Sequence, residues 1–369
     1  MTGLINRRLA IVSTLATALP IAARGQDVTE AKAFVDRYAG SSGAWDGPVS
    51  GPKAAKGKTV VVLASDLTNG GVLGAANGLK EAAAATGWTV KTIEGGGTLS
   101  GRTSAFGQAL ALKPQGVIIL GFNPQEQQVG MKQVRDAGLP MVTWHSLADN
   151  GPSKEHGIFA NVTTKAQDVA KAAAYWAFVD AKQKAAVVIF TDSTYKLAGG
   201  KGNWMKEAIE KLGGKMLELI DTPLAETSTR MPQLTTTLLQ RHGAKWTHSL
   251  AINDLYFDFM GPSLAAAGIA GNASPKGVAA GDGSEAAYQR IRTGQFQAVT
   301  VAEPLNLHGW QMIDEMNRVF AGQPWSGYHS PLHVVTASNI KQDGGARNRF
   351  DPDNGYREAY KSIWGIGKA

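Results

Sequence analysis

Short apolar runs alternate with segments of helical periodicity along most of this chain. The first run, 59–64, is continuous and rich in valine, and Val72, Ala76 and Leu79 then share one face of a predicted helix. The later predicted strands are 89–93, 116–120, 141–144, 158–160, 186–190, 215–220, 249–252, 277–280 and 298–302. Unbroken apolar strands that alternate with helices are typical of parallel sheets covered on both faces. The sequence therefore predicts an α/β fold of the doubly wound type.

The length of 369 residues exceeds the usual size of one domain, so two lobes are expected. Hydrophobic residues make up 43% of the chain, which is enough for two cores. A capping-box pattern at 164–167 opens a predicted helix and indicates the start of the second lobe. Further helices are predicted at 103–112, 203–212, 231–242, 257–267 and 285–293, and another follows Pro304.

The first 25 residues have the layout of a cleaved secretory signal. Arg7 and Arg8 precede a mostly apolar stretch, 9–23, which is shorter than the ~20 residues that a membrane-spanning helix needs. A frayed N-terminal helix is the alternative interpretation, and the paired arginines leave twin-arginine export open. We therefore expect an exported protein that resides in the periplasm.

Residues 26–57 are predicted to form a surface extension with a short helix at 30–38. After this helix, Trp45 is the only large side chain that could anchor the extension. Without residues 1–25 the chain loses three of its 37 basic residues and none of its 30 acidic ones, so a modest positive excess remains. No basic block or basic-aromatic interleaving accompanies that excess. No nucleic-acid partner is expected.

The chain has no cysteine, which excludes disulfides, thiolate zinc sites and cysteine nucleophiles. Its seven histidines lack metal-ligand spacing, and neither a GxSxG elbow nor a dinucleotide fingerprint occurs. The stretch 51–59 differs from a phosphate-binding loop because five residues separate its glycines. We expect no cofactor and no metal ion, and a secreted α/β enzyme stays as the competing class.

Polar residues follow three consecutive apolar runs in the second half of the chain, at Asn253, Asp282 and Glu303. The carboxyl ends of parallel strands meet at one edge of a sheet, where side chains and free helix N–H groups converge on one ligand. Each residue also has a purely structural interpretation, because each can cap or face the N-terminus of a helix. The spacing predicts one shared binding cleft.

The order and spacing of these clusters resemble the C-terminal half of periplasmic sugar-binding proteins of the ribose and galactose type, which serve ABC transporters. The similarity covers 58–340, in which 59–71 (TVVVLASDLTNGG) resembles the first strand and ligand loop of the family. It implies a type I periplasmic binding fold, with two doubly wound parallel-sheet lobes joined by a hinge. It also implies nine ligand-binding residues: Asp66, Asn69, Asn123, His145, Lys201, Trp204, Asn253, Asp282 and Glu303.

The same resemblance places the crossings between the lobes near Asn161, Glu303 and Val334. It implies a first lobe of 58–160 plus 304–333, a second lobe of 161–303 plus 334–345, and a C-terminal tail of 346–369.

Pyranose-binding members of the family place aromatics after the first strand and an Asp-Arg pair after the fourth, where this chain has Gly71-Val72 and His145-Ser146. The first-lobe half of the site is therefore expected to differ in its ligand-binding residues from that of the pyranose-binding members. The resemblance implies an exported monomer that captures a small polyhydroxylated ligand, a monosaccharide or a polyol, and delivers it to the membrane permease of an ABC importer. A receptor for a furanosyl quorum signal or another small molecule, feeding a transporter or a sensor, is the alternative.

Overall fold

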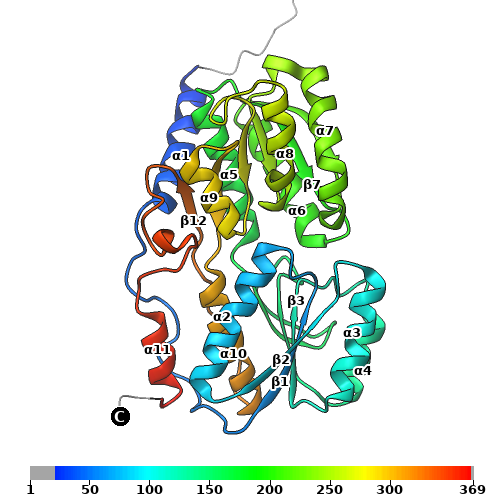
Figure 1. Ribbon diagram of the computed structural model, residues 1–369. Coiled ribbons are helices and arrows are strands. Elements are labelled where there is room, and N and C mark those ends of the chain that lie inside the picture. The colour runs from blue at the N-terminus through cyan, green and yellow to red at the C-terminus, as the bar shows by residue number, and fades with distance from the viewer. Residues whose placement is uncertain (1–20, 367–369) are drawn as a thin grey trace, which may run out of the picture.

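The computed structural model describes residues 21–366, which form two α/β lobes, one above the other in Figure 1. Each lobe contains a six-stranded, mainly parallel sheet, so the fold predicted from the sequence is confirmed. Residues 1–20, which hold most of the predicted secretory signal, lie outside the described residues. Within 21–366 no helix combines the length and the apolar character needed to cross a bilayer.

The sheet of the first lobe has the strand order β2-β1-β3-β4-β6-β5. Its strands are β1 (Thr59–Ala64), β2 (Thr89–Glu94), β3 (Gly116–Leu120), β4 (Met141–Trp144), β5 (Gly151–Ser153) and β6 (Ile158–Val162). Only β5, which was not predicted, runs antiparallel to its neighbour, and its three residues are too few to give a periodic signal. Helices α2 (Gly70–Thr86), α3 (Leu99–Ala111) and α4 (Gln128–Asp136) connect the first four strands.

The sheet of the second lobe has the order β12-β11-β10-β9-β7-β8. Its strands are β7 (Ala186–Thr191), β8 (Lys215–Asp221), β9 (His248–Ala251), β10 (Lys276–Ala279), β11 (Gln297–Ala302) and β12 (His333–Thr336), and only β12 is antiparallel. The helices are α5 (Ala166–Asp180), α6 (Lys196–Lys211), α7 (Thr227–His242), α8 (Leu255–Ala266) and α9 (Glu285–Thr293), with 3-10 turns at Leu224–Glu226 and Gly243–Lys245.

The chain passes between the lobes where β6 leads into α5, again where β11 leads into α10 (Leu305–Phe320), and a third time where α10 leads into β12. Helix α10 lies against α2 and β4 of the first lobe, whereas β12 pairs with β11 in the second. The carboxyl ends of the parallel strands in both sheets consequently face each other across the gap between the lobes (Figure 1).

Helix α6 begins at Lys196, well before the predicted start at residue 203. Glycines at 199, 200 and 202 lower intrinsic helix propensity, which is why the pattern predicted a later start. Tertiary packing overrides that preference, because a side chain at Gly202 would come within 2.7 Å of the Thr191 hydroxyl at the end of β7. The first turn of α6 is thereby placed at the gap between the lobes.

The N-terminal extension is packed more extensively than predicted. Helix α1 (Ile21–Ala39) contacts α5 through the buried Ala31 and Val35. The chain then runs along the left edge of the view in Figure 1 and reaches the first lobe, where the Trp45 ring lies 5.4 Å from the ring of Tyr360 in α11 (Tyr356–Ile363). The two terminal segments therefore hold each other and contact both lobes.

Replacing the half-buried Trp45 with alanine removes its ring contacts with Tyr328, Tyr356 and Tyr360. We expect Trp45→Ala to lower the free energy of unfolding by about 2–3 kcal/mol in urea melts, less than a fully buried tryptophan would cost. Val49, which is 85% exposed in the same segment, provides the control. Val49→Ala should change stability by less than about 0.5 kcal/mol, and equal effects of the two variants would contradict this account of the extension.

Candidate functional site

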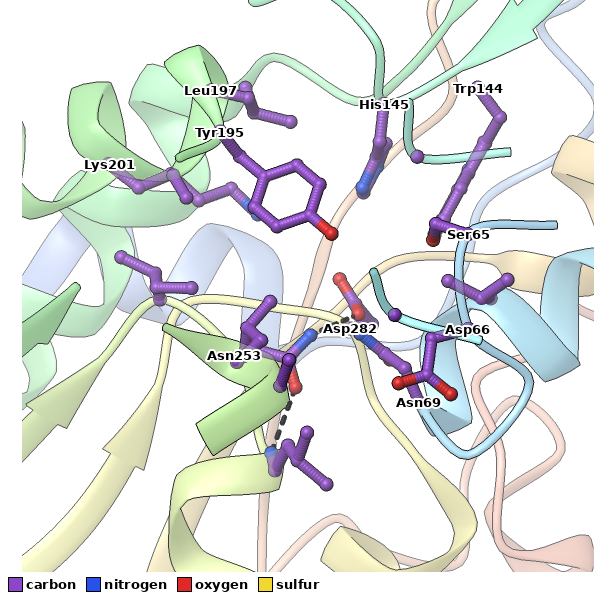
Figure 2. Close-up of a pocket in the computed structure, with 18 residues that line it drawn as sticks. Ser65, Asp66, Asn69, Trp144, His145, Tyr195, Leu197, Lys201, Asn253 and Asp282 are labelled. Carbon is purple, nitrogen blue, oxygen red and sulfur yellow. Dashed lines mark hydrogen bonds between the residues drawn. The ribbon is translucent and has the colours of Figure 1, made fainter. Parts of the chain in front are cut away.

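A cavity lies between the lobes, at the carboxyl ends of strands from both sheets (Figure 2). The cavity volume is about 70 Å³. One water occupies roughly 10–15 Å³ of such a cavity, so it has room for several waters or for one small molecule of similar extent. The lobes also touch at its rim, where the Asn123 amide donates to the Thr194 carbonyl oxygen at 2.8 Å and Arg102 donates to the Tyr195 hydroxyl at 3.0 Å.

Six of the nine predicted ligand-binding residues line this cavity: Asp66, Asn69, His145, Lys201, Asn253 and Asp282. The other three do not. Asn123 joins the two rims, Trp204 packs against the core of the second lobe, and Glu303 is fully buried behind His145 and Lys201. The direct ligand contact predicted for these three residues stays a prediction without support from the shape of the cavity.

Asp282 projects into the middle of the cavity (Figure 2). Its loop is held by the neighbouring Asp254, whose carboxylate accepts the backbone N–H groups of residues 282, 283 and 284 at 2.8–3.1 Å. One Asp282 oxygen accepts a 2.6 Å hydrogen bond from the Asn253 amide, and the other has no hydrogen-bond partner within 21–366. Burial raises the pKa of Asp282 to about 6, although His145 and Lys201 oppose that rise.

Asp282 also meets the opposite lobe. A Cβ atom at Gly71, in the first turn of α2, would lie 1.9 Å from an Asp282 carboxylate oxygen. This close approach explains why the loop after the first strand carries glycine at position 71. The carboxylate consequently faces the N-terminus of α2, whose dipole favours negative charge.

The first lobe contributes polar atoms that stay available for a ligand. Asn69 caps α2 by accepting the Gly71 N–H at 2.9 Å, which leaves its amide N–H₂ group without a partner in the described chain. One carboxylate oxygen of Asp66 accepts hydrogen bonds from the backbone N–H and the hydroxyl of Thr68. The hydroxyl of Ser65 lines the cavity and makes no hydrogen bond to any residue from 21 to 366.

The second lobe contributes mainly aliphatic side chains that sequence reasoning missed. They are Leu197, Ala198, Leu224, Ala225, Ile252 and Leu255, and the ring of Tyr195 joins them. Tyr195 and Leu197 flank the true start of α6, so the misplaced start of that helix hid them. Apolar residues next to strand ends carry no signal that separates cavity lining from core.

Glu303 gathers partners from both lobes in the interior. One carboxylate oxygen lies 2.8 Å from His145 Nε2 and 2.5 Å from the Thr164 hydroxyl, and the other lies 3.1 Å from Lys201 Nζ. Burial alone would raise the pKa of Glu303, but His145 and Lys201 outweigh it and hold the pKa well below the usual value. Glu303 is therefore ionised when the lobes are closed.

His145, Glu303 and His308 place three potential metal-ligand atoms within 4.8 Å of one another. His308 is already bonded through both ring nitrogens, since Nδ1 accepts the Trp144 indole N–H at 2.9 Å and Nε2 lies 2.6 Å from the Ser330 hydroxyl. The Lys201 ammonium beside Glu303 would also repel a cation. The cluster is thus a hydrogen-bond network and does not fit a metal ion.

Comparison with known proteins identifies the same architecture. Residues 60–324 match the sequence profile of the periplasmic binding protein domain. A search of curated proteins found no match. Among solved structures, an ABC transporter solute-binding protein from Agrobacterium vitis bound with alpha-D-tagatopyranose is 16% identical, with a TM-score of 0.70 over 80% of this chain and 99% of that one.

Two further solved structures have a similar fold. A second Agrobacterium vitis solute-binding protein, with bound allitol, is 18% identical, with a TM-score of 0.66 over 78% of this chain and 97% of that one. The periplasmic ribose ABC transporter protein from Conexibacter woesei is 20% identical, with a TM-score of 0.66 over 82% of this chain and all of that one. The profile match covers well over half of the sequence, and the chain therefore belongs to the periplasmic binding protein domain family.

Proposed function

We propose that this protein captures one small, neutral, polyhydroxylated molecule, a monosaccharide or a polyol, between its lobes and delivers it to an ABC importer. The observation that carries the proposal is the Asp282 carboxylate, which is buried in the closed cavity with one oxygen lacking a partner in the described chain. That oxygen opens onto the cavity, where a ligand can reach it. A ligand hydroxyl that donates to it would form a charge-assisted hydrogen bond.

The charges around the cavity favour a neutral ligand. Asp66 and Asp282 both line it, whereas the Lys201 ammonium already donates to Glu303 and to the Ala280 carbonyl oxygen. Anionic ligands such as sugar acids would therefore meet an excess of negative charge, because Asp66, Asp282 and Glu303 outnumber Lys201. The aliphatic residues of the second lobe offer a surface for the C–H face of a sugar or polyol.

The contacts at the rim link ligand binding to closure of the lobes. The hydrogen bonds from Asn123 to Thr194 and from Arg102 to Tyr195 form only while the lobes are together. A ligand that touches both lobes binds this closed state more tightly than an open one. The closed surface is the form that a membrane permease would recognise. Periplasmic location after export and a monomeric state complete the proposal, and family membership supports binding and delivery over catalysis.

A thermal-shift screen of the mature protein tests the ligand class. The screen uses a set of neutral monosaccharides and polyols that includes D-tagatose and allitol. At least one compound of this set should raise the melting temperature by several degrees. At about 100 times its Kd a ligand that binds only the folded state adds about 2.7 kcal/mol of stability. Sugar acids and sugar phosphates serve as the matched negative set. A shift with the anions alone would contradict the proposed neutral ligand, and no shift at all would contradict the function.

The proposal also predicts how affinity depends on pH. A hydroxyl that donates to Asp282 stabilises the ionised carboxylate, so the ligand lowers the pKa from about 6 and binds the ionised form preferentially. Affinity should be constant well above pH 6 and fall by up to roughly tenfold per pH unit below it. Isothermal titration calorimetry from pH 5 to pH 8 measures this profile.

Asp282→Asn is the matched control, because it keeps the shape of the side chain and removes its titration. The variant should bind roughly tenfold or more weakly at pH 8 and show a flatter profile, with no loss of melting temperature. Unchanged affinity would remove Asp282 from the site.

A further inference from the structure

We infer that Glu303 does not touch the ligand but acts as a positioning residue, which holds one cavity-lining donor from each lobe in its binding orientation. The inference rests on the proposed function and adds a role to a residue outside the cavity. Glu303 follows β11 at a crossing between the lobes, and its side chain is 0% exposed. It is absent from the cavity lining, whereas its partners His145 and Lys201 are part of that lining.

The partners of Glu303 come from three parts of the chain. His145 follows β4 in the first lobe, Lys201 lies in α6 of the second lobe, and Thr164 lies at another crossing, between β6 and α5. Thr164 donates both its hydroxyl and its backbone N–H, at 2.5 and 3.4 Å. One carboxylate thus connects both lobes and two of the crossings between them.

The two oxygens of a carboxylate are what this arrangement requires. One accepts from His145 and Thr164, and the other accepts from Lys201. A glutamine amide has only one acceptor oxygen and presents N–H donors on the other side. It can therefore satisfy the donor of one lobe only, and its N–H₂ group would face a second donor.

Besides Glu303, the neighbouring Trp144 ring and the backbone conformation fix the position of His145. Its ring stacks on Trp144 with the centroids 3.7 Å apart and the planes 7° apart, and its backbone has the left-handed φ of 52° that non-glycine residues rarely adopt. The Trp144 indole is fixed in turn by the buried His308. The carboxylate, which accepts from Nε2, keeps a proton on that nitrogen and turns Nδ1 away from Glu303.

Lys201 is placed in the same way from the second lobe. Its ammonium donates to Glu303 and to the Ala280 carbonyl oxygen, and its third proton has no partner within the described part of the chain. A side chain at Gly281 would come within 2.9 Å of Lys201 Nζ and 3.0 Å of Glu303. The loop that carries Asp282 therefore packs directly on the ion pair.

The test compares Glu303→Gln with the unmodified protein by NMR of ¹⁵N-labelled histidine, without any ligand. In the unmodified protein His145 should keep a protonated Nε2 in slow exchange with water. The variant should shift its ring-nitrogen signals towards a mixture of tautomers, and affinity for D-tagatose or allitol should fall roughly 10- to 100-fold. Asp282→Asn is the comparison, since it should weaken binding while the intact Glu303 carboxylate keeps the proton on His145 Nε2.

Thr164→Val provides a milder variant should Glu303→Gln fail to fold, because it retains the carboxylate and removes one donor to it. It should move the His145 signals by a smaller amount than Glu303→Gln does, because the carboxylate stays but loses one of the contacts that fix it. Loss of affinity with unchanged His145 signals would mean that Glu303 contacts the ligand directly, and no change in either measurement would show that it positions nothing. Both results overturn the inference. The spectra need no ligand, so a failed ligand screen would refute the proposed function while leaving this test intact.

Discussion

Buried carboxylates need partners, and the second lobe places three of them at consecutive strand ends. Asp254 is satisfied by backbone N–H groups, which fix the loop of residues 282–284. Glu303 is satisfied by donors from both lobes. Asp282 stays incompletely paired and faces the cavity. In the proposed function, this difference in hydrogen bonding separates Asp282, which would bind the ligand, from Asp254 and Glu303, which position the site.

Much of the fold could be predicted from the sequence. The runs at 59–64, 116–120 and 141–144 coincide with β1, β3 and β4, because strands buried on both faces must be continuously apolar. The start of α6 and the strand β5 could not be predicted. In α6 tertiary packing supports glycines that local propensity disfavours, and β5 is too short to show a period.

The candidate site could be predicted only in part, for a physical reason. Polar residues after strands mark the correct edge of the sheet, and Asp66, Asn69, His145, Lys201, Asn253 and Asp282 all reach the cavity. Position along the chain does not reveal which polar group has its hydrogen bonds satisfied inside the protein. Glu303 sits at the expected strand end, yet four donor contacts enclose it, and this closure is visible only in three dimensions.

The terminal segments add a feature outside the matched family region, 60–324. The solved relatives align over 97–100% of their own length but over only about four fifths of this chain. The extra residues include α1 on the second lobe and the stretch around Trp45 on the first, and Ser42 donates its backbone N–H to Asp343 in the C-terminal part. These contacts join the lobes in addition to the crossings, so the hinge motion that the proposed function requires must deform or release them.

The most direct test of the central claim is a crystal structure of the protein grown with the polyol or sugar that stabilises it most. The account predicts one ligand in the cavity, with a hydroxyl within about 3 Å of the unpaired Asp282 oxygen. Glu303 should still contact His145 and Lys201, and no ligand atom should reach it. A ligand bound elsewhere, or one held by Glu303 while Asp282 turns away, would contradict the account.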